Sequence, residues 1–218
     1  MKRLILLTTL LFSAFIGYGQ GRYFIGVNAG LSFINNNGLN SSTPGATFKN
    51  KPAFVFPAQA GVYAGEKSRL RIELSNFKIK SELNYNYNTT QTGDPHMPSY
   101  AEVKIEVQAV NLNYDYQVLN RGSFDVYASA GLKSLFSTSK DEYTTYADGR
   151  EEETAILISD FNRNLFGLGA GLVGRYNHTS KIGFTFVPAY SLYSESFNKN
   201  SSSKLNRLDL TLGVEYRL

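Results

Sequence analysis

The chain has 218 residues, a formal net charge of +4 and no cysteine, and it contains 15 Tyr, 15 Phe and 19 Gly. This length suits a single domain, the lack of cysteine excludes disulfides and thiolate metal sites, and so small a charge gives no support for nucleic-acid binding. A composition rich in aromatic residues and glycine favours pleated strands over helices, so we expect an all-β protein.

Residues 1–19 have the pattern of a signal peptide. Two basic residues precede a short apolar run that ends at Ile16, and a small-x-small cleavage pattern ends at Gly19. The apolar run is too short to span a bilayer as a helix. We expect cleavage after Gly19, which leaves residues 20–218 as an exported domain that begins with Gln20.

Eight segments of the exported domain carry apolar residues at every second position, as strands with one apolar face do. They cover residues 25–33, 54–64, 70–74, 110–118, 124–132, 166–176, 182–190 and 208–218. Short turns at 66–68, 120–122 and 178–180 alternate with long polar connections at 35–52, 88–99, 138–163 and 194–204. This alternation is typical of outer-membrane barrels, whose short turns are periplasmic. We therefore expect an eight-stranded antiparallel up-and-down transmembrane β-barrel with both chain ends in the periplasm.

A soluble lipocalin-like barrel or a sandwich would show the same alternation, with its apolar face turned inward. The second face of the segments distinguishes the two, because it contains many glycines, which suit a narrow lumen better than a solvated surface. It also contains charged residues of both signs, which can pair inside a barrel. The expected luminal charge network consists of Arg71, Glu73, Asp115, Asp125, Lys133, Arg175, Arg207, Asp209, Glu215 and Arg217.

One hairpin, within residues 70–118, is expected to extend beyond the membrane on the extracellular side. Its even-numbered face changes from apolar to charged along the strands, while its odd-numbered face becomes apolar. We predict a register that places Arg71 opposite Asp115 and, farther along, Lys80 opposite Glu106. A β-bulge in each strand is the alternative explanation.

The last strand ends with a pattern formed by Thr211, Gly213, Tyr216 and Leu218. A polar residue is followed by a glycine two positions later, and hydrophobic residues occupy the antepenultimate and final positions. This pattern resembles the terminal signal that the outer-membrane insertion machinery reads.

Three further stretches carry a family resemblance: residues 105–107 leading into 110–116, residues 127–132 (YASAGL) and residues 166–171 (FGLGAG). Through them the chain resembles the outer-membrane β-barrel family that includes the PorT-like proteins. The resemblance implies an eight-stranded barrel, and a few members of that family are linked to protein secretion. Two residues depart from the family pattern: Gln108, where many relatives have proline, and Leu218, in place of a terminal aromatic residue.

Candidates for catalysis are few, because His96 and His178 are the only imidazoles. Asp94, His96 and Ser99 supply the residue types of a hydrolytic triad, but a proline-rich loop lacks the rigid support that a triad requires. The acidic residues of segment 138–163 lack the spacing of a calcium loop. We expect no enzymatic activity, no cofactor and no metal.

The expected function is therefore a structural or interaction role in the cell outer membrane through long extracellular loops, in support of protein secretion or envelope assembly. A lipid-modifying hydrolase of the outer membrane and a small passive channel are the alternatives. The expected partners are outer-membrane lipid, the barrel insertion machinery and an envelope protein, with no nucleic acid.

Overall fold

The computed structural model describes residues 23–36, 46–85, 98–155, 164–195 and 204–218, and the predicted signal peptide lies outside these ranges. The described strands are β1 (Tyr23–Asn36), β2 (Ala46–Lys51), β3 (Ala53–Val55), β4 (Ala58–Tyr63), β5 (Ser68–Tyr85), β6 (Pro98–Arg121), β7 (Phe124–Tyr146), β8 (Glu151–Ala155), β9 (Asn164–Asn177), β10 (Ile182–Tyr193) and β11 (Leu205–Arg217). Within the described ranges, no helix is long and apolar enough to cross a membrane.

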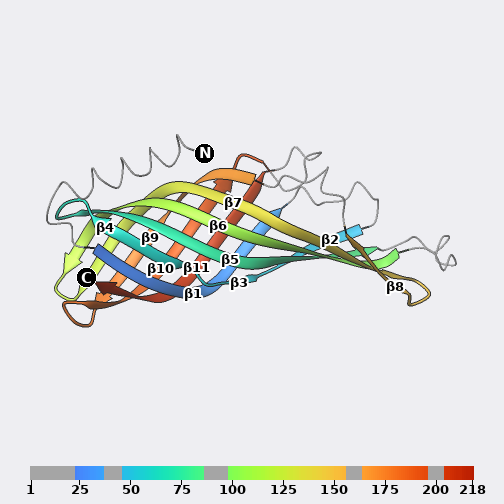
Figure 1. Cartoon of the computed structure of the whole chain (residues 1–218), viewed down its shortest axis with the longest axis horizontal. Helices are drawn as coiled ribbons and strands as arrows, with labels where there is room; N and C mark the ends of the chain where they lie inside the picture. The colour runs from blue at the N-terminus through green and yellow to red at the C-terminus, as the bar shows by residue number, and fades with distance from the viewer. Residues whose placement is uncertain (1–22, 37–45, 86–97, 156–163, 196–203) are drawn as a thin grey trace.

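The strands form one antiparallel sheet that closes into a barrel (Figure 1). Closure occurs where β1 pairs with β11, from Phe24 opposite Arg217 to Asn36 opposite Leu205. Around the ring the order is β1, β4, β5, β6, β7, β9, β10 and β11, with β3 continuing the line of β4 along β1. The predicted eight-stranded antiparallel barrel is confirmed.

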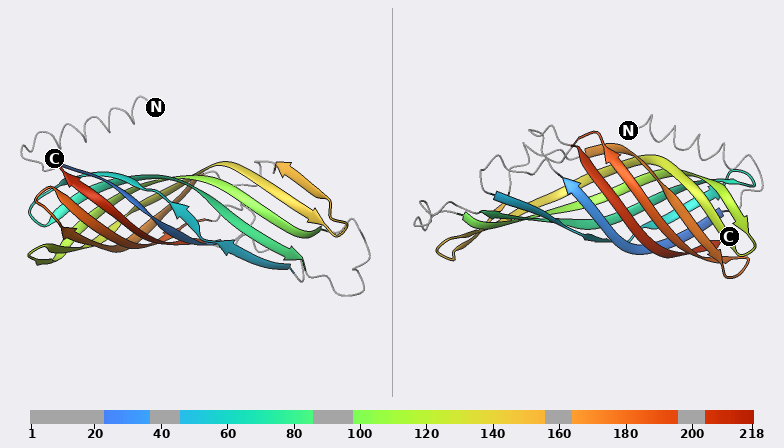
Figure 2. Two further views of the ribbon diagram at one scale, coloured as in Figure 1. Left: turned by 90° about the horizontal axis from the view of Figure 1, so that it is seen from below. Right: turned by 180° about the vertical axis from the view of Figure 1, so that it is seen from behind.

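Both ends of the described chain lie at the rim that carries the short turns, and the backbone N–H of Leu218 donates to the carbonyl of Tyr23 at 2.9 Å. In the views of Figure 2 this rim lies at one end of the molecule, and the long strands β5, β6 and β7 extend to the other end. The turns themselves are residues 64–67, 122–123 and 178–181. Each differs from the predicted turn, because the strands pair out of the predicted register. The shift is two residues at the first and third turns, as in Tyr63 opposite Arg69 and Asn177 opposite Gly183. At the second turn it is three residues, since Phe124 lies opposite Arg121 and a bulge follows between Gln117 and Leu119.

The predicted register of β5 and β6 is also wrong by two residues. Asp115 lies opposite Arg69 rather than Arg71, and Glu106 lies opposite Lys78 rather than Lys80. A shift of two residues keeps every side chain on its own face, so apolar alternation alone cannot detect it. The ladder between β5 and β6 is continuous from Ser68 to Asn84, so the alternative of a bulge in this pairing is excluded for these residues.

Strands β5, β6 and β7 continue well past the rim of the barrel, and β2 and β8 pair with their outer parts (Figure 1). We call this five-stranded region the projecting sheet. It includes much of the segment 138–163 that was predicted as a long polar connection, because β7 runs to Tyr146 and turns into β8 at Asp148-Gly149. Gly149 has a φ of 84°, the left-handed conformation that such a turn requires.

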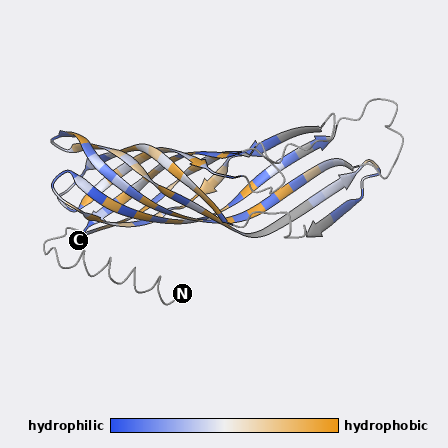
Figure 3. Cartoon of the chain, turned by 90° about the horizontal axis from the view of Figure 1, so that it is seen from above, coloured by the Kyte–Doolittle hydropathy of each residue, from blue (hydrophilic) through white to orange (hydrophobic). Residues whose placement is uncertain are grey.

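Hydrophobic and hydrophilic residues alternate along the strands of the barrel (Figure 3). Large apolar side chains are exposed on the outside, while charged side chains such as Arg71, Asp115 and Arg175 are buried inside. The exposed apolar side chains form a band over every strand of the ring except β4, and among them are Val27, Leu112, Leu132, Leu168 and Leu212. Contact of such a band with water would be unfavourable in free energy, and monomeric soluble proteins rarely expose large contiguous apolar patches. We refer to it as the apolar belt.

Candidate functional site

Arg69 lies at the centre of the luminal charge network, near the short-turn rim. Its guanidinium donates from Nε to Asp115 Oδ2 at 2.9 Å and from Nη1 to Glu215 Oε2 at 2.8 Å, and all three side chains are fully buried. The same guanidinium lies over the rings of Phe24 and Tyr127, with centroids at 4.9 and 4.2 Å. Sequence reasoning missed Arg69, although it shares the odd-numbered face of Arg71.

Each acid that contacts Arg69 also contacts a second arginine. Arg71 lies 3.0 Å from Asp115 and 2.8 Å from Glu73, and Arg175 lies 2.8 Å from Glu215. Buried charges need such pairing, because an unpaired ion in a low-dielectric interior is strongly destabilising. The pairs connect β5, β6, β9 and β11 across the lumen, so the network fixes opposite walls of the barrel relative to each other.

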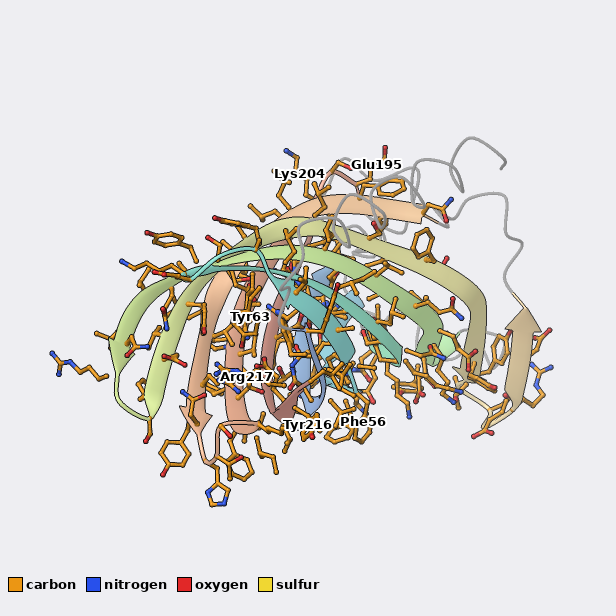
Figure 4. The ribbon with its side chains drawn as sticks, turned by 60° about the vertical axis from the view of Figure 1, so that its left-hand side comes forward. Phe56, Tyr63, Glu195, Lys204, Tyr216 and Arg217 are labelled. Carbon is orange, nitrogen blue, oxygen red and sulfur yellow. The ribbon has the colours of Figure 1, made fainter. Side chains whose placement is uncertain are left out.

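Toward the short-turn rim the network becomes more solvated. Arg217 donates from Nε to the Tyr63 hydroxyl at 3.0 Å, and both residues are labelled in Figure 4 together with Phe56 and Tyr216 of the outward face. Asp125 accepts hydrogen bonds from the side chains of Gln117 and Asn177, each at 2.8 Å. This rim is therefore a polar, hydrogen-bonded end of the lumen.

Toward the other rim, Lys133 donates to Asn113 Oδ1 at 2.7 Å, and Asn113 in turn donates to Glu73 at 2.5 Å. Arg207 donates to Asp209 at 2.8 Å and to Ser32 at 2.9 Å. The cavity beside these groups has a volume of about 20 Å³. A water molecule needs roughly 10–15 Å³ by this measure, so the space suits isolated waters rather than a substrate.

All ten residues predicted for the luminal charge network lie on inward-facing positions. Those that are buried are Arg71, Glu73, Asp115, Asp125, Lys133, Arg175, Arg207 and Glu215, whereas Asp209 and Arg217 are partly exposed. The structure adds Arg69, Gln59 and Asn113 to this set.

Above the network, the lumen is closed by a cluster of buried apolar side chains, which we call the apolar plug. Its members come from strands on all sides of the ring and are Ile34, Ala53, Val55, Phe77, Ile79, Val103, Ile105, Val107, Ala109, Leu135, Leu165, Tyr193 and Leu205. The Arg207 guanidinium lies 4.6 Å from the Phe77 ring centroid, where the two layers meet. Water would have to displace packed apolar groups to pass this point, which argues against the passive-channel alternative.

The residues of the predicted insertion signal lie on both faces of β11. Thr211 and Gly213 face the lumen, while Tyr216 and Leu218 face outward. A Cβ atom at Gly213 would overlap Asn28 Oδ1 and the backbone carbonyl of Val27, so the close approach of β1 requires glycine there. Reading of the signal by the insertion machinery stays a prediction.

The residues considered for catalysis are not brought together within the described ranges. Asp94 and His96 lie outside those ranges, and Ser99 donates to the carbonyl of Thr145 at 2.9 Å. His178 is exposed in its turn beside Phe184. The described residues contain no group of three or more His, Asp or Glu side chains that could hold a metal ion.

The outward face of the projecting sheet is charged. Lys78 pairs with Glu106 at 2.5 Å across β5 and β6, with side chains 64% and 41% exposed, and Lys51 pairs with Glu82 across β2 and β5. The hydrogen bond from Lys51 lowers the pKa of Glu82 below its ordinary value. Burial, followed by the hydrogen bond to Glu82, raises the pKa of Tyr100.

No family model matches this chain, and no curated protein matches its sequence. Its structure is similar to that of Neisserial surface protein A (NspA), with 13% identity, a TM-score of 0.55 and coverage of 90% of this chain and 97% of the other. It is also similar to a major outer membrane protein from Thermus thermophilus, with 13% identity, a TM-score of 0.50 and coverage of 91% and 99%. The chain thus has the fold of small outer-membrane β-barrels, whereas its kinship with the PorT-like proteins stays a prediction.

Proposed function

We propose that the protein is a non-enzymatic barrel of the cell outer membrane whose projecting sheet is an interaction surface for an envelope protein. Protein secretion or envelope assembly is the process we assign to it, in keeping with the sequence resemblance to the PorT-like family. A cleaved signal peptide and the insertion machinery would deliver the chain to that membrane.

The observation that carries this proposal is the exchange of faces along β5 and β6. On the outward side, Leu74 and Leu112 are about half exposed in the belt, and beyond Asn76 and Gln108 the same side carries charged residues. On the inward side the order is reversed, from Arg71 and other polar groups to the apolar plug. Such an exchange is expected where a strand pair leaves lipid and enters water.

The membrane position of the belt can be tested with two arginine substitutions on the outward face of β6. Leu112→Arg should lower the free energy of unfolding in phospholipid vesicles by roughly 2–4 kcal/mol, as charges near a bilayer midplane do. Gln108→Arg, four residues along the same strand, should change it by less than about 1 kcal/mol because it lies beyond the belt. Equal effects of the two substitutions would contradict the assigned membrane boundary.

The orientation and the interaction role need separate measurements. In this cysteine-free chain, Asp148→Cys in the β7–β8 turn should react with an impermeant maleimide in whole cells, and Thr179→Cys in a short turn should not. A photo-crosslinking amino acid at Lys80 on the projecting sheet should then capture a protein, while the same group at Leu132 in the belt should capture lipid only. Surface labelling without any protein captured from Lys80 would leave the location intact and reject the interaction role.

A further inference from the structure

The barrel wall is incompletely hydrogen bonded beside β3. Strand β5 pairs with β4 through residues 69–74 and with β2 through residues 80–85, but its residues 75–79 pair with neither, nor with β3. Strand β3 pairs only with β1. Pro52 and Pro57 flank β3. Proline has no backbone N–H to donate to a neighbouring strand, so these two residues interrupt the pairing between β3 and β5.

A wedge also lies between β1 and β2. Below it, Ser32 of β1 pairs with Ala53 of β3, but the next residues of β1 pair with β11 alone, because β2 leaves β1 to join β5. A pocket of about 290 Å³ occupies this wedge and reaches the neighbouring strands β10 and β11. Residues that line it include Phe33, Tyr190, Leu208, Asn50, Lys51 and Asn206.

The lower wall of the pocket is part of the apolar belt. Phe33, Leu208 and Tyr190 lie side by side on β1, β11 and β10 and remain 39%, 39% and 46% exposed. Directly beyond them, Asn35 lies opposite Asn206 and supplies amide groups. The pocket therefore lies at the level where the belt ends, with one apolar side and one polar side.

Lys51 lines the polar side, and the sheet segment that carries it has an excess of positive charge. The outward positions of the paired β2–β5 segment contain Lys49, Lys51 and Lys80 but a single acid, Glu82, which pairs with Lys51. Three cations against one anion attract a phosphate group, and amide side chains can donate hydrogen bonds to its oxygens.

We propose that this pocket binds one anionic, phosphate-bearing lipid of the surrounding outer leaflet, and the proposal rests on the membrane location proposed above. An acyl chain lies against Phe33, Tyr190 and Leu208, and the phosphate lies at Lys51 and the neighbouring amides. The membrane is the source of this ligand, because the apolar wall of the pocket is continuous with the lipid-facing belt. The lipid fills the wedge beside the residues of β1 that pair with β11 alone.

Native mass spectrometry of the full chain can test this inference after refolding into mixed phosphatidylglycerol and phosphatidylcholine vesicles and extraction into mild detergent. The parent protein should retain one phosphatidylglycerol. Leu208→Trp, which fills the pocket, and Lys51→Glu, which reverses the charge, should each lower that retention about ten-fold. Should Leu208→Trp fail to insert, Lys51→Glu decides the outcome alone, because its site is exposed.

Each variant has a matched control. Leu210 is 39% exposed, like Leu208, and lies on the same face of β11, but it does not line the pocket, so Leu210→Trp should retain the lipid. Lys78→Glu makes the same charge reversal in another cross-strand pair and should also retain it. Loss of lipid in the controls, or equal retention of phosphatidylcholine, would overturn the assignment. An inserted parent without lipid overturns this inference alone, whereas a parent that never inserts overturns the proposed location.

Discussion

Replacing Arg69 by methionine tests whether the luminal charge network holds the barrel together. The change removes two charge-assisted hydrogen bonds, to Asp115 at 2.9 Å and to Glu215 at 2.8 Å, from a fully buried position. Breaking a buried ion pair costs roughly 3–5 kcal/mol, mainly because the remaining charge is left without a partner. Here each acid keeps another arginine, Arg71 or Arg175, so we expect a loss of about 3 kcal/mol, at the lower end of that range.

The assay is urea-induced unfolding in phospholipid vesicles followed by far-ultraviolet circular dichroism, since the chain has no tryptophan. Arg69→Lys should show an intermediate loss, because lysine keeps the charge but not the planar fork that reaches both acids. Lys78→Met, in the exposed pair with Glu106, should cost less than about 1 kcal/mol. If Arg69→Met costs no more than Lys78→Met, the network is not a source of stability and the reasoning is refuted.

Three other predictions concern the plug, the register and the projecting sheet. The purified protein should show no stepwise conductance in planar bilayers, because the apolar plug blocks the lumen, and stable steps would contradict this. Cysteines replacing Ile79 and Ile105, which lie opposite each other, should form a disulfide readily. A cysteine pair at Ile79 and Val107 should not, and the reverse result would support the register predicted from sequence. In a ¹³C NMR titration, the Glu82 carboxyl should titrate with a pKa below 4.5, and this pKa should move toward 4.5 in Lys51→Gln. Because folding lowers the pKa, the pair stabilises the sheet above pH 4.5, and this stabilisation is lost as the pH falls through the pKa of the folded state.

The number of strands and the face of each residue could be read from the sequence, because alternation with period two is a local property of each strand. Val27, Leu112 and Leu212 occupy alternating apolar positions of the predicted segments, and the structure leaves all three exposed on the outside. Register is a relation between strands, and a shift of two residues preserves every face. The correct pairing of Arg69 with Asp115 therefore could not be recognised from alternation.

The luminal site shows the same limit. The charged residues could be assigned to the lumen one by one, but their partners lie far apart in sequence, as in the contact of Arg69 with Glu215, 146 positions later. The apolar plug was predicted only in part, through the odd-numbered face of the β5–β6 hairpin that was expected to become apolar, and its other members were missed for a different reason. Several members, such as Ile34 and Leu205, lie near strand ends. These positions border the segments that were predicted as long polar connections. The pairing gap beside Pro52 and Pro57 was missed as well, since residues 54–64 show unbroken alternation.

The apolar plug also constrains the order in which the protein can fold. Its side chains come from β1, β3, β5, β6, β7, β9, β10 and β11, so it cannot assemble while any part of the ring is open. Contacts between distant parts of a chain form late, because closing large loops costs conformational entropy before any contact compensates for it. Packing of the plug and pairing of β1 with β11 must therefore occur together. Until that step, a partly assembled sheet has two unpaired edges and no packed interior at its outer end.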